Sequence, residues 1–194
     1  MNRPSFTLIA GANGAGKSTL TSGNSSTFAS IPVLDPDTFA KTIRSSGTTI
    51  SPIAAGREVL RLTEEHLKRR QSFAVETTLS GKNYLRLMRY ARDTSRGFEV
   101  TLIYIGTGSV EINIARIAER VRAGGHNVPE VDVRRRYLRS LENLPVAAKN
   151  ADHVLLFDNS HQQGYQLVGI LSRTKSDWFS PLPSWVAELK ATLV

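Results

Sequence analysis

The sequence has 194 residues, of which 40% are hydrophobic, and it contains no cysteine. It therefore excludes disulfides, thiolate metal sites and a cysteine nucleophile, and no apolar run approaches the roughly 20 residues that cross a bilayer. The formal net charge of +8, from 25 basic and 17 acidic residues, is compatible with simple solubility, with an anionic ligand or with nucleic acid.

Strand-like and helix-like segments alternate along the chain, which predicts one α/β domain, residues 1–194, with a mainly parallel sheet of five or six strands. The first apolar run is too short for a secretory signal and continues into a glycine-rich loop, so we expect a core strand and a cytoplasmic protein. Strands are expected over 6–10, 31–36, 72–79, 98–106, 153–160 and 165–173. Helices are expected to begin near residues 17, 37, 54, 80, 110 and 129, and a tail, about 174–194, to pack on the body.

Residues 11–18, GANGAGKS, fit the pattern G-x-x-x-x-G-K-[ST] between a strand and a helix. The glycines let backbone N–H groups turn toward phosphate oxygens, and the helix N-terminus adds partial positive charge. Lys17 is expected to reach the β- and γ-phosphates of ATP, and the Ser18 hydroxyl to bind Mg²⁺. The predicted ATP-binding residues are Gly11, Ala12, Asn13, Gly14, Ala15, Gly16, Lys17, Ser18, Thr19 and Arg120.

Acidic residues stand near the ends of the second and third predicted strands. Asp35 and Asp37 follow the second strand, and Glu76 lies in the third. Because the carboxyl ends of strands in an open α/β sheet meet at the ligand crevice, these groups can accept a proton from a substrate hydroxyl or hold the Mg²⁺ shell. A plain helix N-cap at Asp37 and a structural carboxylate at Glu76 are the alternatives. The D-x-x-G and N-K-x-D elements of GTPases are absent.

Seven arginines and no lysine fall between residues 116 and 139. The planar guanidinium group of arginine binds phosphate oxygens well, and the pair Gly124-Gly125 interrupts the segment as a hinge would. We therefore predict a lid over about 116–139. Arg122 and Arg135 are expected to face each other across this hinge near the γ-phosphate. A solvated basic face is the alternative, and the loop residue His126 is a weak candidate.

The polar residues 158–160, DNS, end an apolar strand. They indicate either the adenine side of the crevice or an Asx-type turn. In the tail, Trp178 and Trp185 are expected to anchor the chain to the body before a short final helix.

Together these segments resemble the zeta-toxin group of P-loop kinases. The resemblance is carried by GANGAGKST, LDPDTFA, AVETTLSG, RVRAGGHNVPEVDVRRRYLRSLENL and LLFDNS, in that order. The first is shared by many kinases, whereas ETTLSG and GGHxVP are more specific to this group. The resemblance implies a three-layer P-loop kinase fold with an arginine-bearing helical lid and ATP as the phosphoryl donor. It also implies a hydroxyl of UDP-N-acetylglucosamine as acceptor, and restraint by a small antitoxin protein.

By position in these motifs, Lys17 and Ser18 match the Walker residues, and Asp37 matches the general base. Asp35 stands where an asparagine is more usual, and the chain is short for the group's substrate-side insertions. Arg120 or Arg122, with Arg134 or Arg135, match the lid arginines. The candidate catalytic residues are Lys17, Asp37, Arg122 and Arg135, and the candidate substrate-binding residues are Asp37, Glu76, Thr77, Thr78 and His126.

We therefore expect an ATP- and Mg²⁺-dependent kinase acting on a small-molecule hydroxyl, with UDP-N-acetylglucosamine or a related nucleotide sugar as first choice. One alternative is a nucleotide-dependent regulatory ATPase or toxin–antitoxin component without a small-molecule acceptor. A nucleic-acid end kinase ranks last, because only Tyr137 is interleaved with the arginines, whereas nucleic-acid surfaces mix lysine, arginine and exposed aromatics. No membrane partner is expected.

Overall fold

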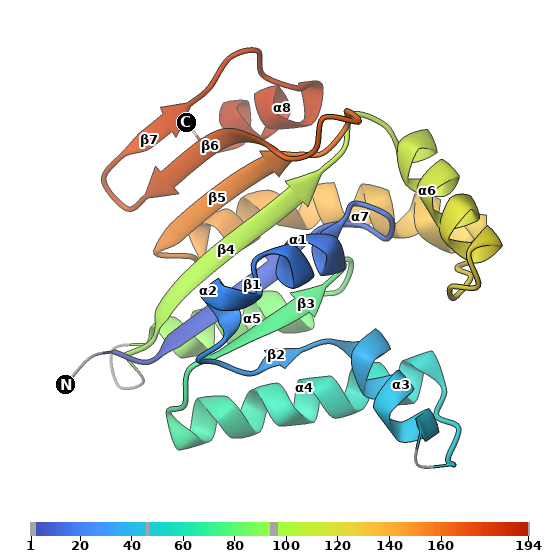
Figure 1. Ribbon diagram of the computed structural model, residues 1–194. Helices are drawn as coiled ribbons and strands as arrows, with labels where there is room; N and C mark the ends of the chain where they lie inside the picture. The colour runs from blue at the N-terminus through green and yellow to red at the C-terminus, as the bar shows by residue number, and fades with distance from the viewer. Residues whose placement is uncertain (1–2, 46, 94–96, 194) are drawn as a thin grey trace.

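A single sheet organises the protein in the computed structural model, which describes residues 3–45, 47–93 and 97–193 (Figure 1). Its seven strands, counted over those residues, run in the order β2-β3-β1-β4-β5-β6-β7. The strands are β1 Ser5–Ala10, β2 Val33–Leu34, β3 Phe73–Thr77, β4 Glu99–Gly106, β5 His153–Asp158, β6 Gln166–Ser172 and β7 Ser176–Trp178. The first five are parallel, whereas β6 and β7 pair antiparallel at one edge.

The sheet is wider than the five or six strands predicted from the sequence. The difference arises in the tail, where the short strand β7 turns back and pairs with β6. Its sequence, SDW, is too short and too polar to show an alternating pattern. The prediction of a mainly parallel α/β sheet is confirmed.

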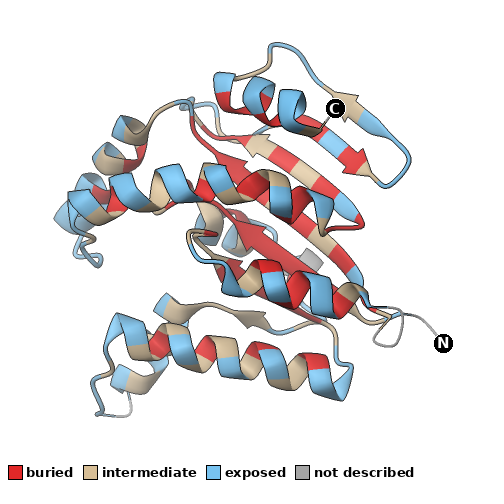
Figure 2. Cartoon of the chain, turned by 180° about the vertical axis from the view of Figure 1, so that it is seen from behind, coloured by how far each residue is buried: buried red, intermediate tan, exposed pale blue. Residues whose placement is uncertain are grey.

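Helices cover the two faces of the sheet unequally (Figures 1 and 2). On one face, α4, α5, α7 and α8 share with the strands a large cluster of buried side chains that includes Phe6, Leu102 and Trp185. On the other face, α1 and α2 close a smaller cluster through Leu20 and Phe28. The helices are α1 Lys17–Gly23, α2 Ser25–Phe28, α3 Pro36–Ser45, α4 Pro52–Arg69, α5 Asn83–Arg92, α6 Val110–Arg122, α7 Glu130–Lys149 and α8 Ser184–Leu193.

Burial on both faces explains why the central strands are almost wholly apolar. The four residues 7–10 of β1 and the residues 73–75 of β3 are all buried. The first turn of α1, the start of α3 and the length of α6 gather where the parallel strands end, and α6 stands beyond the sheet at that end (Figure 1). No helix in the described part of the chain is long and apolar enough to cross a membrane.

Candidate functional site

The glycine-rich loop between β1 and α1 depends on backbone conformations that side chains disfavour. Gly11 has φ +146° and Gly16 has φ +106°. A Cβ at Gly11 would overlap the carbonyl oxygen of Ile105 on β4, and a Cβ at Gly16 would lie 2.6 Å from Nδ2 of Asn159. The loop is therefore held closely against the ends of β4 and β5, in the context that a phosphate-binding loop requires.

Side chains from distant parts of the chain fix this loop through its carbonyl groups. The bonds run from Asn113 Nδ2 to Asn13 O (2.6 Å), from Asn159 Nδ2 to Ala15 O (2.8 Å) and from Tyr165 Oη to Gly16 O (2.7 Å). They hold the loop without using its N–H groups, which are the groups that bind phosphate. Asn113 and Tyr165 were not identified from the sequence, and no local motif marks them.

Residues 158–160 form the Asx-type turn, one of the two options left open by the sequence, while the adenine-side option stays a prediction. The Asp158 carboxylate accepts hydrogen bonds from the backbone N–H and the hydroxyl of Ser160 (3.1 and 2.9 Å), which forms an Asx-type turn. Asp158 also accepts a bond from Nε1 of the buried Trp185 (3.0 Å), so the tail helix α8 is tied to this strand end. Asn159, in contrast, lines the cavity beside the loop.

Lys17, Ser18 and Glu76 lie together under the loop, where Glu76 is buried, Lys17 is partly buried and Ser18 is exposed. Lys17 Nζ donates to the carbonyl oxygens of Gly11 (2.8 Å) and of the next residue (3.2 Å). Burial lowers the pKa of Lys17, while nearby carboxylates raise it. Glu76 is 4% exposed and accepts hydrogen bonds from the hydroxyls of Ser18 (2.8 Å) and Thr21 (2.7 Å). Burial raises the pKa of Glu76, although both hydroxyls oppose that shift.

Asp35, and not Asp37, caps the helix α3. The Asp35 carboxylate accepts hydrogen bonds from the backbone N–H groups of Asp37 (3.2 Å) and Thr38 (3.0 Å). The N-cap interpretation of Asp37 is therefore wrong, because Pro36 takes the first helical position and the capping residue must precede it. Among the described residues, no hydrogen-bond or ion-pair partner of the Asp37 carboxylate is found, and this side chain is exposed.

Two cavities meet at the carboxyl ends of the strands. The first, about 560 Å³, lies beside the glycine-rich loop, and the second, about 400 Å³, lies between α3, α4 and the start of α7. Both are lined by Lys17, Asp35, Asp37 and Glu76. The first cavity is also lined by Gly14, Gly16, Ser18, Thr19, Arg116, Ile117, Arg120, Asn159, His161, Gln162, Gly164 and Tyr165. The second is also lined by Pro36, Pro52, Ile53, Gly56, Arg57, Leu60, Thr77, Thr78, Ser80, Tyr84 and Arg136.

The predicted substrate-side residues separate in the structure. Thr77 and Thr78 line the second cavity, where the Thr78 hydroxyl bonds to that of Ser80 (2.9 Å). His126 is exposed and lines neither cavity, and its carbonyl oxygen accepts a bond from Arg120 Nη2 (2.8 Å). The prediction that the His126 side chain lies at the substrate site is therefore not supported by its position. The sequence contains no feature that orients a loop side chain of this kind.

The arginine cluster faces the cavities through Arg120, which was predicted to bind ATP, and through Arg116 and Arg136, which were not among the candidate site residues. Arg116 and Arg120 line the first cavity, and Nη1 of Arg116 is buried without a hydrogen-bond partner among the described residues. Arg136 lines the second cavity. Arg122 and Arg135 line neither cavity.

Helix geometry explains the difference. Arg116 and Arg120 are one turn apart and share a face of α6, whereas Arg122 lies about 200° further round the axis than Arg120. Arg135 forms an ion pair with Asp132 on its own helix. The two glycines end α6 rather than continue it, since the N–H of Gly125 bonds to the carbonyl oxygen of Arg120 (2.8 Å).

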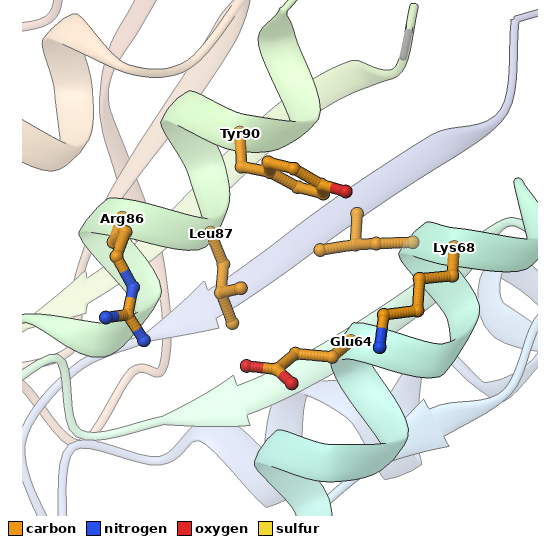
Figure 3. Close-up of a pocket in the computed structure, with 6 residues that line it drawn as sticks. Glu64, Lys68, Arg86, Leu87 and Tyr90 are labelled. Carbon is orange, nitrogen blue, oxygen red and sulfur yellow. The ribbon is translucent and has the colours of Figure 1, made fainter.

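A further hollow of about 220 Å³ lies on the flank of the molecule between α4 and α5 (Figure 3). Leu67 and Leu87 contribute apolar side chains to it, and Glu64, Lys68, Arg86 and Tyr90 complete its lining. It shares no lining residue with the two cavities at the strand ends. It is therefore not part of the candidate site.

Comparison with known proteins places this geometry in a family. The family model described as Zeta toxin matches residues 1–166. An uncharacterized protein of Haemophilus influenzae is 42% identical over 127 residues, which are 66% of this chain and 88% of that protein.

Two solved structures share the fold at low identity. AvrRxo1-ORF1:-ORF2 with ATP has a TM-score of 0.70 at 15% identity and covers 98% of this chain and 64% of that chain. The structure of the PezAT chromosomal toxin–antitoxin system of Streptococcus pneumoniae has a TM-score of 0.58 at 14% identity. The match covers 100% of this chain and 87% of that chain. This chain thus spans less than two thirds of the AvrRxo1 chain. The matched family and the fold support a nucleotide-dependent, kinase-like function, and the chain belongs to the zeta toxin family.

Proposed function

We propose that this protein is an ATP- and Mg²⁺-dependent phosphotransferase that moves the γ-phosphoryl group of ATP to a hydroxyl of a small metabolite. The observation that carries the proposal is that two cavities meet at Lys17, Asp35, Asp37 and Glu76. Phosphoryl transfer needs a donor and an acceptor in line, with electrostatic stabilisation and a base between them. A single-substrate hydrolase has no need of the second cavity.

The first cavity is assigned to ATP. The loop N–H groups and Lys17 bind the phosphates, and Arg116 and Arg120 approach from α6. We assign these two arginines in place of Arg122, because of their positions on the helix. On α7 we assign Arg136, which lines the second cavity, in place of Arg135, which was expected near the γ-phosphate.

The residues present fit Mg²⁺ bound mainly through phosphates and water. The described residues contain no cluster of three or more His, Asp or Glu side chains that could hold a metal alone. Mg²⁺ in kinase sites uses one or two carboxylates, a hydroxyl and substrate phosphates, so Ser18 with Glu76 would be sufficient. When bound there, the ion would neutralise charge on the transferred phosphoryl group.

Asp37 is assigned as the general base. Its carboxylate lines both cavities and has no bonded partner among the described residues, so it can accept a proton from an acceptor hydroxyl. Thr77 and Thr78 offer hydroxyls and backbone groups on the acceptor side. The family supports UDP-N-acetylglucosamine as the first acceptor to test, and a small protein antitoxin as a partner.

The test uses purified protein, ATP-Mg²⁺ and a bacterial metabolite extract, read by mass spectrometry. We expect at least one metabolite ion to become heavier by one phosphoryl group, and none with the Lys17→Ala variant. Release of phosphate without any phosphorylated metabolite would contradict the proposal and favour a regulatory ATPase. Transfer of label from ATP to added RNA or DNA ends, but to no metabolite, would favour the nucleic-acid end kinase.

A further inference from the structure

The long helix α7 carries three large apolar side chains on its outer surface. Val131 is 73% exposed, Leu138 is 61% exposed and Val146 is 47% exposed. The other large apolar side chains that are exposed in the described part of the chain are spread over other segments: Ile53, Tyr90, Val121, Ile170 and Phe179. Single exposed apolar residues are ordinary on a protein surface, whereas a cluster of them marks a surface that another molecule covers.

The three side chains lie on one side of α7. An α-helix turns by about 100° per residue, so residues 131, 138 and 146 fall within an arc of about 80° and span about 22 Å of its length. The exposed residues Arg135 and Glu142 lie inside the same arc. We call these five residues the outer face of α7. The helix lies between α5 and α8 over one side of the sheet, and its exposed residues run along the side away from the sheet (Figure 2).

A groove continues this apolar surface toward α8. It has a volume of about 320 Å³, and Leu138 and Glu142 of the outer face contribute to its lining. The other lining residues are mostly apolar: Leu141, Leu144, Pro145, Trp185, Glu188, Leu189 and Thr192. A molecule that covered Leu138 would therefore also close part of this groove and remove further apolar surface from water.

The charges on and beside the outer face balance, although the whole chain has a net charge of +8. The ion pairs there are Arg134 with Glu111 and Glu130, and Arg135 with Asp132. The exposed Arg139 and Lys149 add two positive charges, and the exposed Glu142 adds one negative charge, which gives four basic and four acidic side chains. Because a net positive charge keeps copies of a protein apart, two copies meet least repulsion at a balanced face.

The outer face is complementary to itself when two copies of α7 lie antiparallel. With a two-fold axis between positions 138 and 139, Val131 of one copy stands opposite Val146 of the second copy, because both are equally far from the axis along the helix. In the same way, Arg135 of one copy stands opposite Glu142 of the second copy. Leu138 lies beside its own symmetry mate at the centre. Glu142 has no ion-pair partner among the described residues, so its charge is available to this contact.

We propose that the outer face of α7 is the interface at which two copies of this chain associate as an antiparallel, two-fold symmetric dimer. Two Val131–Val146 contacts, one central Leu138 pair and two Arg135–Glu142 ion pairs hold it. A pair of single helices buries less than the roughly 800 Å² per partner of a standard interface, so we expect a dissociation constant in the micromolar range. None of the five residues lines either cavity at the strand ends, so the dimer does not depend on the proposed function.

Sedimentation velocity of the full chain, from about 5 to about 500 µM, measures the association. Wild type should change from monomer to dimer within this range. Leu138→Glu should raise the dissociation constant about ten-fold or more, because it places two carboxylates at the centre of the interface. Ile53→Glu, at an apolar residue of α4 that is 71% exposed, is the matched control and should change the constant less than about two-fold. Circular dichroism checks that each variant is folded.

A charge exchange tests the ion pair across the axis. Arg135→Glu and Glu142→Arg should each raise the dissociation constant about five-fold or more, because each sets like charges opposite one another twice in the dimer. The double variant with both changes in one chain should restore most of the wild-type affinity. Glu64→Arg, at an exposed residue of α4, controls for the change in net charge. Restoration requires the two residues to meet across the interface, so a general effect of charge would not produce it.

Introduced cysteines report the register, because the chain has no cysteine of its own. In the antiparallel dimer, Val131→Cys in one copy lies opposite Val146→Cys in the other, whereas two copies of either variant hold their sulfur atoms about 22 Å apart. A short bismaleimide should therefore join a mixture of the two variants and neither variant alone. Leu138→Cys should cross-link with itself.

The proposal is overturned if wild type stays monomeric at about 500 µM. It is also overturned if Leu138→Glu dimerises as tightly as wild type, or if the double charge exchange fails to restore association. Cross-linking of Val131→Cys with itself, and not with Val146→Cys, would contradict the antiparallel register. A monomeric chain whose Leu138→Cys variant cross-links to a different protein in a cell extract would assign this face to that protein and overturn the dimer.

Discussion

Two aspartates at opposite ends of the sheet, Asp152 and Asp37, differ in whether the fold supplies them with partners. At the amino end of β5, the buried Asp152 accepts hydrogen bonds from the N–H of Val100 (2.8 Å) and from Arg173 (2.7 Å), with Arg92 at 3.8 Å. At the carboxyl ends of the strands, Asp37 has no such partner among the described residues. Pairing within the fold, rather than residue type, therefore separates charges that hold the structure from charges left for a ligand.

The comparison predicts that Asp152 matters for stability and Asp37 for activity. Asp152→Asn should lower the free energy of unfolding by about 3 kcal/mol, because it leaves the buried N–H of Val100 and the guanidinium of Arg173 without a charged acceptor. Urea unfolding followed by circular dichroism measures this loss. Asp177→Asn, at an exposed pair with Lys175, is the control and should change stability by about 0.5 kcal/mol or less. If Asp152→Asn kept wild-type stability but lost phosphoryl transfer, the assignment of Asp152 to stability and Asp37 to activity would be wrong.

Stability should depend on pH through the same residue. Burial tends to raise the pKa of Asp152, but hydrogen bonds from Val100 and Arg173, with nearby arginine charge, outweigh it and lower the pKa below 3.8. A lowered pKa in the folded state adds stability above the ordinary value, and that stability is lost as the pH falls through the folded-state pKa. The stability gap between wild type and Asp152→Asn should therefore be full near pH 7 and shrink below about pH 4. A gap independent of pH would contradict this account.

Much of the carboxyl end could be predicted from the sequence, because its motifs fix local geometry. The loop motif determines Gly11 to Ser18, and a carboxylate at the end of β3 reaches Ser18 since β3 lies beside β1. Asp35 could also have been identified as the cap, because Pro36 marks the first turn of the helix. The fold class follows from the same alternation of strands and helices.

The sequence could not show which arginines of α6 and α7 face the cavities. With seven arginines in one segment, several different choices of arginine fit the expected lid over a phosphate. The face of α6 that meets the cavity is set by the packing of this helix against the loop through Asn113. The contacts of Asn13 with Arg136 and of Gly16 with Tyr165 join residues more than a hundred positions apart. Such contacts leave no trace in the local sequence.

A smaller effect is expected at Tyr165. Tyr165→Phe removes the hydrogen bond to the Gly16 carbonyl oxygen (2.7 Å) and keeps the ring, so ATP affinity should fall by about five-fold, equivalent to about 1 kcal/mol. Fluorescent ATP-analogue titration measures the change. Tyr90→Phe, on the flank between α4 and α5, is the matched control. An unchanged affinity in Tyr165→Phe would show that the loop does not need this bond.

The smallest effect is expected at Arg122, which lines neither cavity. Arg122→Gln should change kcat and the KM for ATP by less than about two-fold, as expected for an exposed arginine. Arg120→Gln, two residues earlier on the face toward the cavity, should raise the KM for ATP by about ten-fold. A reversed order of these two variants would favour Arg122, the arginine of α6 that the sequence analysis named as a catalytic candidate.

The central claim is that Asp37 is free of structural duties and serves the reaction. The most direct measurement compares wild type and Asp37→Asn for phosphoryl transfer, ATP affinity and melting temperature in one set of conditions. We expect transfer to fall by about 10²- to 10⁴-fold, as for loss of a general base, with ATP affinity within two-fold and the melting temperature unchanged. Transfer at the wild-type rate in Asp37→Asn, with ATP still bound, would contradict the account.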